Sequence, residues 1–204
     1  EERRGNQSAV VAEYLEYDQA LRLMVEFAND PAISVTAQPT RAYPDGPAGA
    51  TLIGYTGRVT ADDLEQHPGI SRTARLGRTG LEKQYESVLA GRDGVREIER
   101  DANNRAHRVL HERRPTPGHT LQLHLDLELQ RQAAMELTSA VKRHRASGGA
   151  VVVMDPNSGG VLAMATSPTF DNNWFVSAGH DTEVQQTLTA ASKPLLNRSI
   201  SGQY

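Results

Sequence analysis

The chain contains no cysteine among its 204 residues. Disulfides, thiolate metal sites and cysteine nucleophiles are therefore excluded, although the absence of cysteine does not identify a compartment. Aromatic residues are also scarce, at 5% of the chain. The remaining composition, 38% hydrophobic and 23% charged, is that of a globular protein long enough to bury one core or two small ones.

A strong net charge and a long apolar run are missing as well. The formal net charge of −3 gives no general attraction to nucleic acids or anionic membranes. A membrane-spanning helix needs about 20 apolar residues, and no run approaches that length. The opening Glu1-Glu-Arg-Arg4 is not followed by the apolar region of a signal peptide. We therefore expect no membrane anchor within this chain.

The stretch from Gly148 to Pro168 predicts a β-hairpin. Two apolar runs, Ala150–Met154 and Val161–Met164, flank the turn-forming cluster Asp155–Gly160. The first run scarcely alternates, which predicts a strand covered on both faces. Pro168 is expected to end the second strand, because proline lacks the N–H that a sheet ladder needs.

Two helix starts carry capping signals. Thr60 precedes Ala-Asp-Asp-Leu, which places acids in the first turn, where the helix dipole favours negative charge. Thr79 is followed three residues later by Glu82, the spacing of a capping box, and predicts a helix over Thr79–Leu89 that closes at Gly91.

The longest predicted helix spans Leu127–His144, with an apolar face formed by Leu129, Ala133, Ala134 or Met135, Leu137 and Val141. Shorter elements follow from periodicity and breakers. They are helices at Tyr17–Asn29 and Val184–Ala191; a short helix or turn at Ala48–Tyr55 that ends at Gly54; strands at Ile33–Ala37, Gly94–Arg100, Ala106–His111 and Leu121–Asp126; and irregular segments at Pro39–Pro47 and Pro115–Gly118.

Several stretches follow one another in a distinctive order: Arg41-Ala-Tyr-Pro-Asp-Gly46 with Leu52-Ile-Gly-Tyr55; Leu76–Glu86 with Leu89-Ala-Gly-Arg-Asp-Gly94; Leu121–Gln130; the hairpin with Ser167-Pro168; and Asn197–Tyr204. In this order they resemble class B penicillin-binding proteins, the membrane-anchored cell-wall transpeptidases. The first two resemble the R-x-Y-P-x-G … G and G-x-x-G-x-E … L-x-G-x-x-G motifs. The third resembles the L-T-I-D-x-x-L-Q start of the transpeptidase domain, with His124 where a small polar residue is usual. The resemblance covers about Gln38 to Tyr204.

This resemblance implies an α+β fold in two parts. Residues 1–117 would form the elongated pedestal, or dimerisation, module of short strands and helices. Residues 118–204 would form the opening helix and β-hairpin of the transpeptidase domain, truncated before the catalytic serine.

The chain departs from the family pattern in two places. The R-G-x-I-x-D-R-x-G-x-x-L-A segment is missing, and Glu1–Gly5 is only a vague echo of it. The S-x-x-K nucleophile, expected soon after Tyr204, and the S-x-N and K-T-G motifs are absent in context. We therefore expect the chain to be inactive alone, and we assign it no catalytic, cofactor-binding or metal residue and no cofactor.

For the complete parent the resemblance implies peptidoglycan cross-linking, in which a serine attacks a D-Ala-D-Ala stem peptide and β-lactams acylate the same serine. This chain would be the scaffold, at the extracytoplasmic face of the bacterial membrane. Its pedestal would contact a glycan polymerase or other cell-wall synthesis proteins, self-association is a further expectation, and nucleic acid is not a partner. The alternative is a stand-alone extracytoplasmic module that binds cell-wall glycan or a partner protein.

Four patterns imitate functional sites. Ser139-Ala-Val-Lys142 matches S-x-x-K, but we interpret it as a solvated helix face. Arg78-Thr-Gly80 imitates K-T-G and is interpreted as a turn in which Gly77 and Gly80 supply unusual backbone angles. Gly77–Gly80 also matches the nucleotide-clamping loop of a KH domain, a weak alternative in an acidic chain. The fourth pattern is a group of histidines, His107, His111, His119 and His124, favoured as surface residues over a zinc site.

The aromatic residues near the end of the predicted hairpin have two interpretations. Phe170, Trp174 and Phe175 could line a binding groove. Aromatics in such a position more often belong to the core, and that interpretation is preferred.

Overall fold

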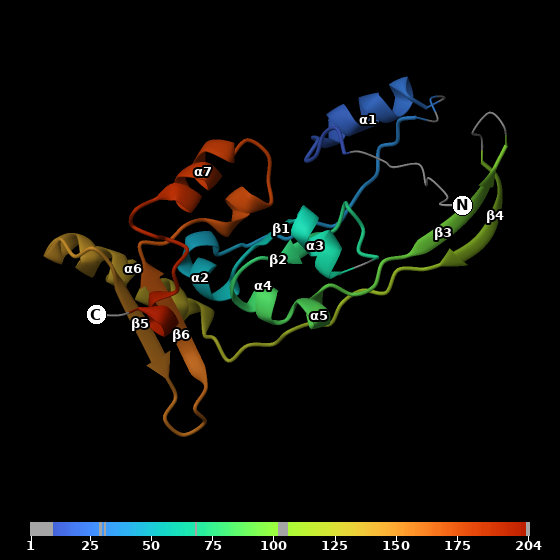
Figure 1. The fold of residues 1–204 in the computed structure, drawn as a ribbon. Coiled ribbons are helices and arrows are strands. Elements are labelled where there is room, and N and C mark those ends of the chain that lie inside the picture. Colours follow the sequence, from blue (N-terminus) through green and yellow to red (C-terminus); the bar gives the residue numbers. More distant parts are fainter. Residues whose placement is uncertain (1–9, 29, 31, 68, 102–105, 203–204) are drawn as a thin grey trace. The chain divides into compact units, whose positions relative to one another are not determined.

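The computed structural model describes residues 10–28, 30, 32–67, 69–101 and 106–202 (Figure 1). Two compact units are present. The first comprises Glu1–Pro39 and Gly94–Arg114, and the second comprises Thr40–Asp93 and Pro115–Tyr204. Helices and small antiparallel sheets alternate along the chain, which confirms the expected α+β class.

The first unit contains one helix and one hairpin. Helix α1 spans Tyr17–Glu26 with Asp18 in its first turn, as expected, while the predicted stop at Asn29 and Pro31 lies outside the described residues. Strands β3 (Val95–Arg100) and β4 (Ala106–Arg113) pair antiparallel, with two register irregularities. This hairpin was predicted, although the expected turn at residues 102–105 is outside the described part of the chain.

The strand predicted at Ile33–Ala37 is wrong, because these residues have no regular structure. Alternation of side chains favours a strand only where a second strand is available to pair with it. Within the described residues the sheets contain only the pairs β1–β2, β3–β4 and β5–β6.

The first half of the second unit is built from very short elements. A 3₁₀ turn, η1 (Gly46–Ala48), leads into α2 (Ala50–Ile53), and β1 (Thr56–Arg58) pairs antiparallel with β2 (Arg75–Gly77). The helices are α3 (Ala61–Gln66), α4 (Gly80–Gln84) and α5 (Glu86–Leu89). The predicted short helix ending at Gly54 is confirmed, and Gly54 has a φ of 83° at its C-cap.

The second half begins with α6, which spans Leu127–His144 as predicted. The Asp126 carboxylate accepts a hydrogen bond from the Leu129 N–H at 3.0 Å and so caps the helix. The apolar face is half-buried and includes Ala134, whereas the alternative, Met135, is 60% exposed. The remaining elements are β5 (Gly149–Met154), β6 (Val161–Ser167), η2 (Asn172–Phe175), α7 (Asp181–Thr189) and α8 (Arg198–Ser201).

The predicted hairpin is confirmed as β5 and β6, and β6 ends at Ser167, immediately before Pro168. Figure 1 shows α6 and α2 beside it. The expectation that both faces of the first strand are covered is not met, since Val152 is 41% exposed and Met154 is 54% exposed. The buried strand is β6 instead, whose buried residues are Ala163, Ala165, Thr166 and Ser167.

The strand predicted at Leu121–Asp126 is wrong. This segment has no regular structure, and one backbone hydrogen bond, from the Asp126 N–H to the Leu162 carbonyl at 2.9 Å, joins it to β6. Further along that strand, the backbone of Met164 is bonded to the side chain of Gln130. A side chain thus occupies a position at which a pairing strand would have to continue.

The buried core of the second unit is aromatic. Tyr55 stacks on Phe175 with ring centroids 3.7 Å apart, and Phe170 meets both rings edge-on. Trp174 packs against the same cluster. The interpretation of the aromatics as core residues is therefore confirmed, and the core joins the residues around α2 to those around η2.

The two predicted caps have different outcomes. At Thr60 the capping box is present: the hydroxyl accepts a hydrogen bond from the Asp63 N–H at 3.3 Å, and the Asp63 carboxylate accepts from the Thr60 N–H at 2.7 Å. At Thr79 the capping box is wrong, because the hydroxyl makes no cap hydrogen bond and Glu82 is engaged elsewhere. The predicted single helix is also divided at Tyr85 into α4 and α5.

We therefore expect Thr60→Ala to lower the free energy of unfolding by about 1 kcal/mol, through loss of the cap. The matched variant Thr79→Val should change it by less than about 0.5 kcal/mol, because no cap bond is removed. Urea unfolding followed by the fluorescence of Trp174 measures both. A larger loss for Thr79→Val than for Thr60→Ala would contradict the capping pattern described.

Candidate functional site

Residues 41–55, which carry the first of the motifs and are called the first motif segment below, make polar contacts with α4, α6, β6 and η2. We call the residues that make these contacts the motif junction. Its members are Arg41, Tyr43, Thr51, Glu82, Gln130, Thr166, Asn172 and Asn173. All but Arg41 and Asn173 are buried.

Glu82 is the charged centre of the motif junction. One of its carboxylate oxygens, Oε1, pairs with Nε of Arg41 at 3.0 Å and accepts a hydrogen bond from the Tyr43 hydroxyl at 3.4 Å. That hydroxyl in turn accepts from the N–H of Thr56 at 3.2 Å. Burial, and secondly the negative charge of Glu82, raise the pKa of Tyr43 to about 12. Tyr43 therefore remains a hydrogen-bond donor at any physiological pH.

Two asparagines of η2 bind the backbone of the first motif segment. The Asn173 side chain accepts from the Tyr43 N–H at 3.0 Å and donates to the Tyr43 carbonyl at 2.8 Å. Asn172, only 1% exposed, donates to the carbonyl of Gly54 at 2.9 Å. Side-chain amides thus satisfy backbone groups that have no strand partner, which a buried segment requires.

Helix α6 and strand β6 also bind the first motif segment through their side chains. Gln130 of α6 donates to the Ala48 carbonyl at 2.5 Å, and the Arg131 guanidinium pairs with Asp45 at 2.7 Å. On β6, the hydroxyl of Thr166 lies 3.0 Å from that of Thr51, and both residues are buried. The first motif segment and the β5–β6 hairpin are therefore joined by specific polar contacts as well as by the aromatic core.

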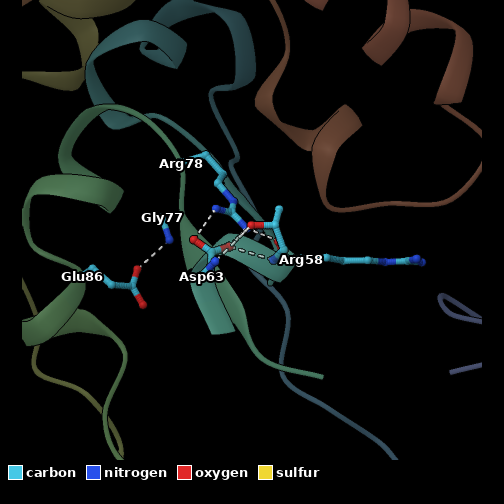
Figure 2. Close-up of polar contacts among 6 residues, drawn as sticks. Arg58, Asp63, Gly77, Arg78 and Glu86 are labelled. Carbon is cyan, nitrogen blue, oxygen red and sulfur yellow. Dashed lines mark hydrogen bonds and ion pairs between the residues drawn. The ribbon is translucent and has the colours of Figure 1, made fainter. Parts of the chain in front are cut away.

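A second polar cluster supports the β1–β2 pair (Figure 2). The guanidinium of Arg78 binds the Asp63 carboxylate through two nitrogens, at 3.1 and 2.7 Å, and also donates to the Arg58 carbonyl. Figure 2 shows the Arg58 side chain directed away from this cluster. Hydrogen bonds from Arg78, and secondly those from Thr60, hold the pKa of Asp63 far below its usual range.

Arg78-Thr-Gly80 is confirmed as a structural turn. Gly80 has a φ of 60°, and a Cβ there would lie 2.5 Å from the Leu52 carbonyl oxygen. The expectation of an unusual angle at Gly77 is wrong: its φ is not positive, and the residue is small because a Cβ would lie 2.2 Å from the Glu82 backbone. Gly77–Gly80 also joins a strand to a helix, not two helices, so the KH-type interpretation is wrong.

The other imitations of functional sites lie on exposed surfaces. Ser139 and Lys142 are both exposed on α6, which confirms a solvated helix face. His107 and His111 are exposed on β4, and His119 and His124 are exposed in irregular segments. Among the described residues, no group of three His, Asp or Glu side chains is arranged to hold a metal ion. No helix in the described ranges is long and apolar enough to cross a membrane.

Comparison with known families accounts for this arrangement. Residues 2–123 match the penicillin-binding protein dimerisation domain, and residues 149–204 match the penicillin-binding protein transpeptidase domain. The chain belongs to the class B penicillin-binding proteins. It comprises their pedestal and the start of their transpeptidase domain.

Curated relatives agree with this assignment. The peptidoglycan D,D-transpeptidase MrdA of Escherichia coli K12 is 34% identical over 192 residues, which cover 91% of this chain and 29% of that protein. FtsI of the same strain, also a peptidoglycan D,D-transpeptidase, is 30% identical over 164 residues, covering 80% and 25%. The chain thus spans under a third of the length of these relatives.

Solved structures show the same fold. A penicillin-binding protein (PBP2) in complex with MreC from Helicobacter pylori gives a TM-score of 0.65 at 27% identity, covering 89% of this chain and 33% of that one. A chain of a peptidoglycan synthase complex, described as coordinating polymerization and crosslinking, gives 0.68 at 35% identity, covering 88% and 33%.

Sequence reasoning located the motif segments but missed most of the contacts between them. Glu82 was interpreted as a helix-capping residue, and no role was given to Gln130, Asn172 or Asn173. A polar residue within an otherwise apolar helix face was the available signal for Gln130. Asn172 and Asn173 lie in a loop, where no periodicity marks a buried amide.

The lowered pKa of Asp63 predicts a pH-dependent contribution to stability. A carboxyl whose pKa is lower folded than unfolded stabilises the fold above its ordinary pKa of about 3.9, and the contribution is lost as the pH falls through the folded value. Asp63→Asn should therefore be less stable than wild type at pH 7, and the difference should shrink below about pH 4. Urea unfolding at pH 7 and pH 3 measures it.

Arg78→Met is the matched background for this measurement. Without the guanidinium, Asp63→Asn should have a much smaller effect at pH 7. An equal effect in both backgrounds would show that Arg78 does not stabilise the charged carboxylate.

Gly54 offers a test of the close approach between the two motifs. A Cβ there would lie 1.9 Å from the Thr79 carbonyl oxygen, and φ is +83°. Gly159 has a φ of +73° with nothing within 4 Å. We expect Gly159→Ala to cost about 1–2 kcal/mol from backbone strain alone, and Gly54→Ala at least about 2 kcal/mol more. Equal unfolding midpoints for the two variants would contradict the close packing.

Proposed function

We propose that this chain is the scaffolding part of a peptidoglycan cross-linking enzyme, and that it holds the start of the transpeptidase domain in a fixed position against the first motif segment. The observation that supports this most directly is the motif junction. Apart from Gln130, its residues come from the two regions matched by the family descriptions, and the amides of Asn172 and Asn173 in the second region bind backbone groups of the first. Contacts of this kind specify geometry more narrowly than apolar packing does.

In this proposal the chemistry belongs to the complete protein. A serine in an S-x-x-K motif outside these 204 residues attacks a stem peptide that ends in D-Ala-D-Ala, and β-lactams acylate the same serine. No residue of this chain takes a catalytic, cofactor-binding or metal-binding part. Such a nucleophile must be placed accurately, and placing it is the work proposed for the scaffold.

We also propose the division into modules and the setting in which they act. The pedestal would comprise residues 1–117 and the transpeptidase part residues 118–204, supported by family matches over residues 2–123 and 149–204. The pedestal would contact a glycan polymerase or other cell-wall synthesis proteins at the extracytoplasmic face of the membrane. Support comes from the structural relatives, one in complex with MreC and one in a peptidoglycan synthase complex.

Labelling with a fluorescent penicillin tests the proposal. The 204-residue chain should not be labelled covalently, because its one S-x-x-K sequence, Ser139–Lys142, lies exposed on α6. The natural gene product that contains this chain should be labelled to about one equivalent, and excess unlabelled penicillin should block the label.

Two outcomes would contradict the proposal. A label on the 204-residue chain that Ser139→Ala abolishes would make Ser139 a nucleophile. A gene product that stays unlabelled would favour the stand-alone binding module.

A further inference from the structure

Gln130 is a buried polar side chain that makes three hydrogen bonds, each to a backbone group. It lies on α6 and is 2% exposed. Its Nε2 donates to the carbonyls of Ala48 at 2.5 Å and Met164 at 2.9 Å, and its Oε1 accepts from the Met164 N–H at 2.8 Å. Three segments therefore meet at one amide: η1 of the pedestal motif, helix α6 and strand β6.

The bonds to Met164 resemble strand pairing. A side-chain amide that binds both the N–H and the carbonyl of one residue presents the same donor and acceptor as a neighbouring strand. Met164 stands opposite Val152 of β5 in the hairpin. Gln130 thus takes the place of a third strand at this point and fixes the position of β6 relative to η1.

Met164 also contacts the segment that precedes the expected nucleophile. The Asn197 side chain donates to the Met164 sulfur at 3.9 Å and caps α8 by accepting from the Ser199 N–H at 3.1 Å. The Ser199 hydroxyl donates to the carbonyl of Ala165, the next residue of β6, at 3.3 Å. Helix α8 and its cap therefore contact Met164, which Gln130 binds, and Ala165, the next residue of β6.

We propose that Gln130 is a positioning residue that transmits the placement of the pedestal motif, through Met164, to α8 and so to the nucleophile segment that follows it. The proposal rests on the function proposed above. The route is short and contiguous: Ala48 carbonyl, Gln130 amide, Met164 backbone, Met164 sulfur, Asn197. A second link runs beside it through the hydroxyls of Thr51 and Thr166.

Replacement of Gln130 by methionine keeps the length of the side chain and removes the amide. The Ala48 carbonyl and both backbone groups of Met164 then lose a partner in a buried site. Because unsatisfied buried polar groups are unfavourable, we expect η1 and β6 to move apart until water or another group binds them. Because spatial adjacency alone does not demonstrate coupling, the test must separate altered placement from lost stability.

The main measurement is the second-order rate of acylation by a fluorescent penicillin in the natural gene product. It is made at a temperature at which far-UV circular dichroism shows every variant to be folded. We expect Gln130→Met to acylate about tenfold or more slowly than wild type, because misplacement by about 1 Å can cost up to 100-fold in rate. Thr51→Val, which removes the parallel link, should slow acylation in the same direction by a smaller factor.

Leu137→Ala is the matched control. Leu137 also lies on α6 and packs on Gly149 of β5, with its Cδ1 3.0 Å from the position of a Cβ at that glycine, but it makes no bond to the motif junction. It should destabilise the protein with an acylation rate within about twofold of wild type. The proposal would be overturned if the Gln130→Met variant were acylated at the wild-type rate. It would also be overturned if Leu137→Ala lowered the acylation rate as much as Gln130→Met does.

Hydrogen exchange in the 204-residue chain separates this inference from the proposed function. The N–H groups of Ile200 and Ser201 are bonded to the Asn197 carbonyl at 3.2 and 2.9 Å. Gln130→Met should speed their exchange relative to Leu137→Ala at matched stability, whether or not the gene product binds penicillin. Unchanged exchange there would refute the positioning role, whereas a wild-type gene product that is not labelled would refute only the proposed function.

Discussion

The structure depends on side-chain amides that take the place of missing strands. The first motif segment has regular hydrogen bonding of its own only in η1 and α2, and the rest of its backbone lies against buried residues and must be satisfied by other groups. Asn173 binds both backbone groups of Tyr43, Asn172 binds the Gly54 carbonyl, and Gln130 bridges Ala48 and Met164. Removal of any of these amides leaves a buried backbone group without a partner, a loss that apolar packing cannot replace.

The motif glycines follow from the same constraint. Hydrogen bonds between backbone groups and short side chains bring the two motif segments close together. At Gly54 and Gly80 the backbone of the other segment is too close to leave room for a Cβ. The charged centre at Glu82 then holds the two motif segments through Arg41 and Tyr43. Such a junction suits a scaffold, because directional hydrogen bonds allow little movement of the first motif segment relative to β6 and η2. In the proposed function, the junction fixes the position of β6 and of α8, which contacts β6.

Elements with strong periodicity could be predicted from sequence, and contacts made by single polar residues could not. Helix α6 was predicted at both ends because its apolar face repeats over five turns, and both hairpins were marked by turn residues between two predicted strands. The capping box at Thr79 failed because Glu82 is bound by Arg41, which lies 41 positions earlier in the chain. The strand at Leu121–Asp126 failed because Gln130 occupies the edge of β6. Long-range competition of this kind leaves no local pattern.

The central claim is that the first motif segment and the transpeptidase hairpin open as one unit. Native-state hydrogen exchange in increasing urea tests it most directly, through the N–H of Tyr43, bound to Asn173, and the N–H of Met164, bound to Gln130. The account predicts that both amides exchange through the same opening, with equal free energies and equal dependence on urea. Exchange of the Met164 N–H through a smaller opening, while the Tyr43 N–H stays protected, would contradict the account. It would show that the hairpin opens independently of the first motif segment.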